Sequence, residues 1–431
     1  MKNLTQRHGG TKDTEEGKVR GIHGLTRRNK DWEIRKLGEV CIVERGSSPR
    51  PIEKYLTNTS EGVNWIKIGD TKGVDKYICS TKEKITKDGA EKSRYVKEGD
   101  FILSNSMSFG RPYIMKTDGY IHDGWFVFRL PNYIDIDYFY YLLISPSVQE
   151  QIQSLGAGAI VKNISSDLVK KVIVTYPKSL HEQKRIVAIL DECFSAIDKA
   201  KANAEKNLKN ARELFESYLQ GVFENGSWKK IKLSDITLDI TDGDHLPPPK
   251  SESGLPFITI SNINKATHEI DFSDTFKVPQ QYYNNLKPNR KPVKGDVLYT
   301  VTGSYGIPVL IKDDFAFCFQ RHIGLIRPSA KLNSKLLFYW ILSPQAVMQA
   351  NKTATGTAQK TVSLTSLRNF EFPNIPLQEQ KTIVRQLDVL RAETKKLEAV
   401  HNKKIADLEE LKKSMLEKAF NGELKIRKGE M

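Results

Sequence analysis

The sequence lacks both long apolar runs and paired cysteines. No apolar stretch approaches the roughly 18 residues that a membrane-spanning helix needs. The first 30 residues are polar and basic, and they lack the apolar segment that a signal peptide contains. None of the four cysteines, Cys41, Cys79, Cys193 and Cys318, belongs to a C-x-x-C pair. We therefore expect a cytoplasmic protein without a disulfide framework or a structural metal site.

Motifs of common catalytic sites are also missing. The chain contains no G-x-x-x-x-G-K-[ST], no Rossmann-type glycine fingerprint, no H-E-x-x-H and no [ND]-P-P-[YF]. A nuclease site made of carboxylates that are scattered along the chain is not excluded, because Asp and Glu are common and such a site has no motif. Asp100 and Asp296 each follow a glycine and precede an apolar run, so we interpret them as turn residues that open a strand.

The charge balance is strongly basic. The formal net charge is +15 over 431 residues, which favours a polyanionic partner. We expect residues 1–30 to form a basic disordered tail. A nucleic-acid-binding arm is the alternative interpretation of this segment.

One helix start is written twice. Seven of the ten residues from Glu182 to Asp191 are identical to those from Glu379 to Asp388, at an offset of 197 (379 − 182). Weaker matches precede each copy, such as "VKEGDFILSNSMSFGRPYI" and "PVKGDVLYTVTGSYGIPVL". A repeat of nearly 200 residues indicates a duplicated domain and not a solenoid.

Each copy combines a globule with a long helix. Short β-like runs, "NWIKIGD", "DFILSNS", "GWFVFRL" and "KKVIVTY", and one helix over "DYFYYLLISPSVQEQIQSL" predict a mixed α/β globule, in the α+β class. We place the globules at residues 31–179 and 228–375 and the helices at 180–224 and 376–424. The aromatic residues of the globules are expected to be core.

The two helices carry matched apolar stripes with a heptad-like spacing. This pattern predicts an antiparallel coiled coil about a pseudo-two-fold axis, with the globules separated by a rod of roughly 64 Å. The alternative is that each helix packs on its own globule. A fragment ending near Glu224 would expose its stripe and is expected to dimerise. The stripe residues include Ile186, Leu190, Ile197, Leu208 and Phe215 in the first helix and Ile383, Leu387, Leu390, Thr394, Leu397 and Ile405 in the second.

Three pairs of matched loops have a composition suited to DNA. Small residues let the backbone approach a phosphate, lysine neutralises it, and amide side chains read base edges. An ordinary surface loop has the same composition, so the signal rests mainly on its repetition. The candidate residues are Lys162, Asn163, Lys360, Gln359 and Thr357 in the first loop pair, Ser108, Arg111, Ser304 and Tyr305 in the second, and Arg45, Ser47 and His245 in the third.

The ordered motifs resemble a known family. "W-x-x-x-K-L-x-x-[VI]", "G-D-x-[IL]", "G-x-x-x-K-x-[IV]-S" and "E-Q-K-x-I-V-x-x-L-D" all occur twice between Asp31 and about Leu424. This pattern is similar to the specificity subunit of Type I restriction–modification enzymes. The resemblance implies two target recognition domains that read a bipartite double-stranded DNA site, separated by spacer helices.

The resemblance also implies partners and a division of labour. Two methyltransferase subunits would bind along the helices, and endonuclease–translocase subunits would join them. The chain itself would be non-catalytic and without a cofactor, while S-adenosylmethionine, ATP and Mg²⁺ would belong to the partners. The alternatives are a stand-alone DNA-cleaving enzyme with an unrecognised acidic site and a scaffold that never binds DNA.

Overall fold

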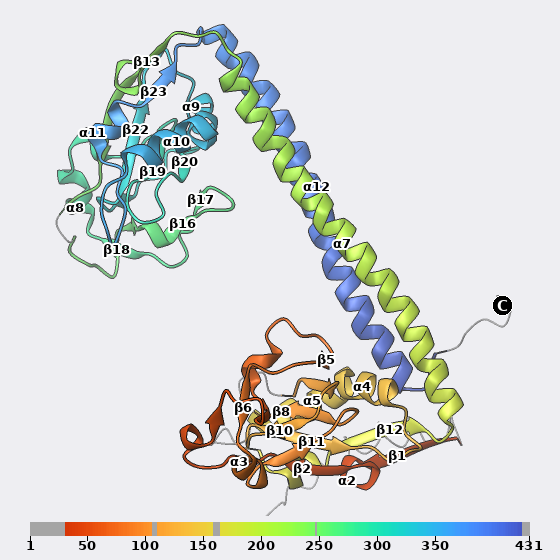
Figure 1. Ribbon diagram of the computed structural model, residues 1–431. Helices are drawn as coiled ribbons and strands as arrows, with labels where there is room; N and C mark the ends of the chain where they lie inside the picture. The colour runs from red at the N-terminus through yellow and green to blue at the C-terminus, as the bar shows by residue number, and fades with distance from the viewer. Residues whose placement is uncertain (1–30, 106–109, 158–163, 246–247, 425–431) are drawn as a thin grey trace, which may run out of the picture. The chain divides into compact units, whose positions relative to one another are not determined.

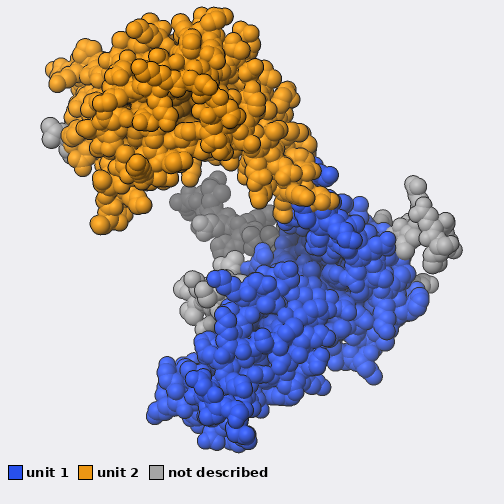
Figure 2. Space-filling view, turned by 45° about the horizontal axis from the view of Figure 1, so that its top comes forward, with its two compact units in different colours: residues 1–202, 404–431 blue, residues 203–403 orange. Residues whose placement is uncertain are grey.

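A computed structural model describes residues 31–105, 110–157, 164–245 and 248–424. The predicted basic tail lies outside these ranges. The chain divides into two compact units, each built from one globule and parts of both long helices. Unit 1 contains residues 1–202 and 404–431, and unit 2 contains residues 203–403 (Figure 2).

Unit 1 contains two five-stranded sheets and one two-stranded sheet. Its short helices are α2 (Leu37–Val40), α3 (Lys87–Glu91), α4 (Ile136–Ile144), α5 (Pro146–Ala157) and α6 (Ser166–Val169). One large sheet has the order β2 (Ile42–Arg45), β11 (Trp125–Arg129), β8 (Phe101–Ser104), β9 (Pro112–Met115), β5 (Tyr77–Ile78). The other has the order β3 (Leu56–Thr57), β6 (Glu83–Ile85), β4 (Val63–Ile66), β10 (Gly119–Ile121), β7 (Arg94–Val96). The small sheet pairs β1 (Trp32–Lys36) with β12 (Ile173–Pro177).

Unit 2 repeats this plan with smaller sheets. Its four-stranded sheet has the order β14 (Thr237–Asp242), β22 (Ile323–Pro328), β19 (Val297–Thr300), β20 (Pro308–Leu310). A three-stranded sheet joins β18 (Phe276–Val278), β15 (Leu255–Ile258) and β21 (Cys318–Phe319). Two pairs complete it, β13 (Lys230–Lys232) with β23 (Glu371–Pro373) and the hairpin β16 (Ile263–Asn264) with β17 (Glu269–Ile270). The short helices are α8 (Gln280–Asn285), α9 (Ser334–Leu342), α10 (Pro344–Thr353) and α11 (Leu364–Arg368).

The predicted strands are confirmed, but the predicted helix over "DYFYYLLISPSVQEQIQSL" is wrong as one piece. It forms α4 and α5, which are separated at Ser145. Pro146 cannot continue the hydrogen-bond ladder of α4, but it fits the first turn of a new helix. Unit 2 breaks at the same place, where the Ser343 side chain caps α10 in front of Pro344.

The two predicted long helices are α7 (Leu180–Glu224) and α12 (Leu377–Phe420) (Figure 1). They run antiparallel to each other within each unit. In unit 1, Lys412 Nζ lies 3.0 Å from Asp198 Oδ1. In unit 2, Tyr218 Oη donates a hydrogen bond to Gln386 Oε1 at 3.3 Å.

The repeated "EQK" motif fastens each long helix to its globule. Gln183 and Gln380 are both fully buried. The Gln183 amide accepts from Asp135 N at 2.7 Å and donates to Pro177 O and Tyr133 O. Gln380 makes the matching bonds to Asn333 N, Ile375 O and Lys331 O. One buried amide therefore satisfies three backbone groups, which explains why the same residue is written at both helix starts.

A second repeated contact follows two turns later. The hydroxyl of Tyr141 donates to Asp191 Oδ1 at 2.5 Å, and that of Tyr339 donates to Asp388 Oδ1 at 2.7 Å. The "L-D" end of the repeated motif therefore also joins helix to globule.

The predicted stripe is only partly correct. Its buried members include Ile186, Leu190, Ile197, Ile383 and Leu387. Leu208, Phe215, Leu390 and Ile405 are half-buried. Leu397 is 44% exposed, so its place in the stripe is wrong, and Thr394, at 3% exposure, is the buried residue of that turn.

Both predicted packing modes occur together. The first turns of α7 contribute Ile186 and Leu190 to the core of the first globule, and that core also contains Leu416 and Phe420 from α12. In unit 2, Leu219 of α7 and Leu387 of α12 likewise belong to one core, so in each unit the helices pack on each other and on the globule.

Asp100 and Asp296 are turn residues, as expected. Their carboxylates accept from Lys97 N and Val293 N, three residues earlier. They also pair with Arg129 at 2.5 Å and Arg327 at 2.7 Å. Within the described part of the chain, no helix is long and apolar enough to cross a membrane.

Candidate nucleic-acid interface

Three loops of unit 2 leave the four-stranded sheet at one edge. The antiparallel register places Thr300, the last residue of β19, opposite Ile323, the first of β22. It also places Asp242, the end of β14, opposite Gly324. The loops 301–307, 320–322 and 243–245 therefore start side by side. We call this set, together with the loop 355–361, the loop edge.

The Gly-rich loop 355–361 joins this edge through the backbone. Gly303 N donates to Lys360 O at 2.9 Å, and Val362 N donates to Val301 O at 2.8 Å. The hydroxyls of Thr302 and Thr361 lie 3.2 Å apart. Gly356 has a φ of +113°, where a side chain would be strained and a Cβ would lie 2.3 Å from Gln359 O. Two loops whose contacting residues Thr302 and Thr361 lie 59 positions apart in the sequence thus form one surface.

Several predicted side chains on this surface are unengaged. Thr357, Gln359 and Lys360 are exposed and make no side-chain hydrogen bond or ion pair to any described residue. Ser304 is also exposed. Tyr305 is half-buried, and its hydroxyl donates to Asn351 Oδ1 at 2.9 Å. The lysine, the amide and the hydroxyls can bind an incoming polar ligand without breaking an existing contact.

His245 is held by acidic neighbours at the same edge. Its Nε2 lies 2.8 Å from Asp242 Oδ2. Arg290 pairs with Asp242 at 3.4 Å and with Asp244 at 3.6 Å. The imidazole is exposed but oriented by this carboxylate, which suits a positioned hydrogen-bonding group.

Arg321 and His322 belong to the loop edge, although they are not among the DNA-binding residues predicted from the sequence. They form the turn between β21 and β22, and His322 O accepts from Val301 N at 2.9 Å. Arg321 is exposed and has no hydrogen-bond or ion-pair partner among the described residues. The signal that could have found it is the basic pair in "CFQRHIG", directly before a buried strand.

Unit 1 builds the same edge. Asn105 N donates to Gly124 O at 2.8 Å, and Asn105 Nδ2 donates to Ile164 O at 3.5 Å. The backbone bond to Gly124 matches the bond from Val301 N to His322 O in unit 2, and the side-chain bond to Ile164 joins the ends of the two predicted loops. The predicted residues Ser108, Lys162 and Asn163 lie outside the described residues.

Asp123 organises the rest of the unit 1 edge. Its carboxylate accepts from Ser48 Oγ at 2.9 Å and pairs with Arg50 at 3.3 Å. Burial raises its pKa, but the Ser48 bond and its other contacts outweigh that effect, so the pKa of Asp123 is lowered. Arg45 Nε donates to Asp123 O at 3.0 Å, and Ser47 N donates to Ile121 O. Arg45 and Ser47 therefore hold the loop, whereas Arg50, which was not predicted, is the exposed cation.

Arg111 is also engaged. Its Nη2 donates to Val74 O at 3.0 Å and to Asp75 Oδ1 at 3.1 Å, and its guanidinium lies 5.5 Å from the Tyr113 ring centre. Asp75 is fully exposed, so a phosphate could replace it as the partner of Arg111.

The described residues contain no cluster of three or more His, Cys, Asp or Glu that could hold a metal ion. Cys41 and Cys318 are buried, and burial raises the pKa of each thiol to about 12. A thiol with a raised pKa is a poor nucleophile. The chemistry that the arrangement offers is binding of an anion beside groups that can read base edges.

Comparison with known proteins agrees with this geometry. The chain matches the family described as "Type I restriction modification DNA specificity domain" over residues 29–209 and 225–408. It is 25% identical over 316 residues to the Type I restriction enzyme EcoBI specificity subunit of Escherichia coli. That match covers 67% of this chain and 65% of the relative, just under two thirds of its length. The MjaVIII specificity subunit of Methanocaldococcus jannaschii is 23% identical, covering 96% of this chain and 97% of the relative.

Two solved structures share the fold. One, described under "complex assembly and conformational transition of the type I R-M system", matches with a TM-score of 0.73 at 19% identity. It covers 92% of this chain and 99% of that one. The HsdS subunit from Thermoanaerobacter tengcongensis matches with a TM-score of 0.55 at 21% identity, covering 91% and 97%.

Proposed function

Because this chain belongs to the Type I restriction–modification DNA specificity family, we propose that it reads a bipartite double-stranded DNA target. Each globule reads one half-site, and the bases between the half-sites are unread. The chain directs a methyltransferase and an endonuclease to that target.

The loop edge is the observation that carries this proposal. Backbone bonds of this edge recur in the described part of unit 1, where Asn105 N–Gly124 O matches Val301 N–His322 O and Gly46 N–Trp125 O matches Gly243 N–Ile323 O. The described side chains differ between the two units. Unit 2 offers Arg321, Gln359 and Lys360, and unit 1 offers Arg50 beside Asp123. A common scaffold with different exposed groups is what two different half-sites require.

The chain acts without chemistry of its own in this proposal. Asp100 and Asp296, interpreted from the sequence as turn residues, are engaged in turns and ion pairs. S-adenosylmethionine, ATP and Mg²⁺ would be bound by the partner subunits. Incubation of the purified chain with plasmid and Mg²⁺ distinguishes a non-catalytic subunit from a stand-alone nuclease, since only the nuclease would cleave the plasmid.

The helix pair offers a surface for the methyltransferase. Val389, Leu397 and Val400 of α12 are 60%, 44% and 60% exposed and lie on one side of the helix by their spacing. Exposed apolar residues arranged in a row favour a protein partner. We expect two methyltransferase subunits to bind the helices and the endonuclease–translocase to join that complex. Leu397→Asp with Val400→Asp should abolish co-purification of the methyltransferase while thermal unfolding stays unchanged.

Salt dependence of DNA binding tests the proposal directly. Lys360→Ala and Arg321→Ala should each weaken binding and lower the slope of log affinity against log salt by about 0.9. Lys331→Ala is the matched control, because Lys331 is exposed beyond the opposite end of β22. Unchanged slopes for both edge variants would remove the loop edge of unit 2 as the DNA surface.

A further inference from the structure

In each unit a cation lies against a pair of aromatic rings, but only the cation of unit 1 forms an ion pair with a described residue. In unit 1, Lys76 Nζ lies 4.8 Å from the Tyr140 ring centre and 5.5 Å from that of Tyr141. It is paired with Asp137 at 2.6 Å. The unit 1 cation is therefore neutralised inside the chain.

The matching aromatic pair of unit 2 is Phe338 and Tyr339, and its cation is Arg391 from α12. The guanidinium carbon lies 4.9 Å from the Phe338 ring centre and 5.7 Å from that of Tyr339. The residue that matches Asp137 is Lys335, which pairs with Asp388 at 2.7 Å. The carboxylate that neutralises the unit 1 cation is thus replaced by a lysine in unit 2.

Arg391 has no hydrogen-bond or ion-pair partner among the described residues, and its Nη1 is buried. Burial lowers the pKa of Arg391, and this effect outweighs the opposing effect of Tyr339, Asp388 and Glu398. Asp388 and Glu398 also act on Arg391, but each is paired with another cation, Lys335 and Arg212 respectively. A ligand anion in contact with the guanidinium would therefore be favourable.

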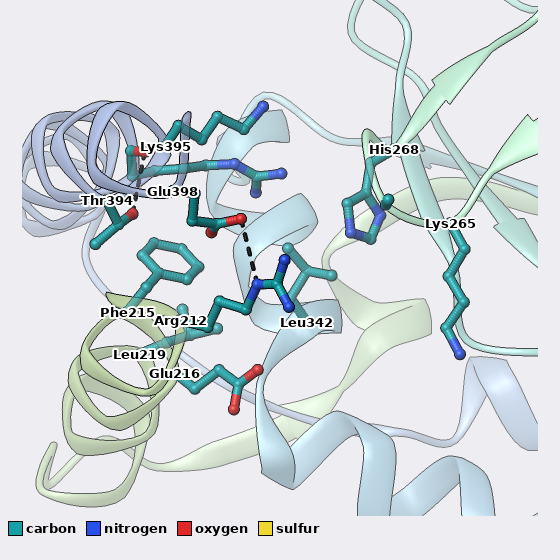
Figure 3. Close-up of a pocket in the computed structure, with 12 residues that line it drawn as sticks. Arg212, Phe215, Glu216, Leu219, Lys265, His268, Leu342, Thr394, Lys395 and Glu398 are labelled. Carbon is teal, nitrogen blue, oxygen red and sulfur yellow. Dashed lines mark hydrogen bonds and ion pairs between the residues drawn. The ribbon is translucent and has the colours of Figure 1, made fainter. Parts of the chain in front are cut away.

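Arg391 lines an open cleft of about 630 Å³ within unit 2. One wall is the helix pair, and the other is the turn of the β16–β17 hairpin, which contributes Lys265 and His268 (Figure 3). Four cations line the cleft, Arg212, Lys265, Arg391 and Lys395, against two carboxylates, Glu216 and Glu398.

Internal pairing leaves this excess of positive charge in place. Arg212 and Glu398 neutralise each other at 3.3 Å, as the dashed line in Figure 3 marks. Lys265 and Lys395 are exposed and, like Arg391, have no ion-pair partner in the described part of the chain. Three cations without an ion-pair partner among the described residues, from two separate elements, therefore line one cleft together with one further carboxylate, Glu216.

We propose that this cleft binds a phosphodiester group of the DNA backbone. The inference rests on the proposed function and adds a contact outside the loop edge. A guanidinium binds two phosphate oxygens at once, and the flanking ammonium groups add charge without orientation. Because the cleft binds phosphate and not a base edge, its contribution is independent of sequence.

The test compares the full-length chain with three single variants in salt titrations of binding to a labelled duplex. Arg391→Gln, Lys395→Gln and Lys265→Gln are each expected to lower the log–log salt slope by about 0.9 per lost contact, equally on duplexes of different sequence. Lys381→Gln, an exposed lysine on the first turns of α12, is the control and should leave the slope unchanged. Thermal unfolding is measured for each variant as a control for folding. If Arg391→Gln does not fold, the two lysine variants still test the inference.

The outcomes distinguish a failure of the cleft inference from a failure of the proposed function. If the wild-type chain and Lys360→Ala behave as proposed but all three cleft variants keep the wild-type slope, the cleft inference is wrong and the function stands. If the wild-type chain does not bind duplex DNA at low salt, the proposed function fails as well. A changed sequence preference in a cleft variant would mean that the cleft reads bases, which also contradicts the inference.

Discussion

Lys201 Nζ of α7 lies 2.7 Å from Glu409 Oε1 of α12. The offset of 197 residues relates Lys201 to Glu398 and Glu409 to Arg212, and these two residues form the corresponding pair in unit 2 at 3.3 Å. Equivalent positions of the two helices thus carry opposite charges. At these positions α7 supplies the cation and α12 the carboxylate.

This charge arrangement predicts which half-chains associate. Pairing of α7 with a second α7 would place Lys201 opposite Arg212, and pairing of α12 with itself would place Glu398 opposite Glu409. Like charges in these positions are unfavourable. When the chain is cut between Asn225 and Gly226 and both halves are co-expressed, native mass spectrometry should show the heterodimer as the main species.

The apolar stripe alone predicts a first-half homodimer, so the two effects can be separated. The Lys201→Glu change in the first-half fragment should increase self-association, because the introduced carboxylate would face Arg212. Equal self-association of the original and changed fragments would show that packing alone decides pairing.

The buried glutamines are expected to be the most sensitive polar residues of the chain. Gln183→Ala or Gln380→Ala leaves three backbone groups without partners, each worth about 1–3 kcal/mol. We expect a loss of several kcal/mol in the unfolding of the affected unit, measured by chemical denaturation. Gln378→Ala, an exposed glutamine on the same turn as Gln380, should change little.

Two leucines of α12 test the correction of the stripe. Leu387 is fully buried and belongs to the core of unit 2, so Leu387→Ala should cost about 2–5 kcal/mol. Leu397 is 44% exposed, so Leu397→Ala should stay within about 0.5 kcal/mol. Similar losses of unfolding free energy at both positions, measured by denaturant titration, would mean that Leu397 is part of the apolar stripe after all.

Helix length is expected to set the unread gap of the target. Inserting seven residues at matching points of α7 and α12 adds two turns, roughly 10 Å, to each helix. Mapping of methylated sites in cells that carry the complex should show the same half-site sequences with a gap longer by about three base pairs. Changed half-sites with a constant gap would contradict the spacing role. An insertion in α7 alone is the control, because it breaks the matched helix pairing.

The sequence by itself determined the duplication, the two long helices and the loops that carry the candidate residues. These features follow from local pattern, because helix periodicity and the offset of identical motifs are readable along the chain. It also identified the turn role of Asp100 and Asp296, since a glycine and an apolar run flank each of them.

Only the tertiary structure decided which side chains meet. The exposure of Leu397, the addition of Arg321 to the loop edge and the absence of an ion-pair partner for Arg391 among the described residues all depend on the neighbours that folding brings together. Nothing in the sequence around Arg391 distinguishes it from any other arginine on a helix. It forms no ion pair with a described residue because Lys335 occupies the position of Asp137 and pairs with Asp388, and because Glu398 pairs with Arg212. Aromatic rings of α9 and α7 lie against its guanidinium.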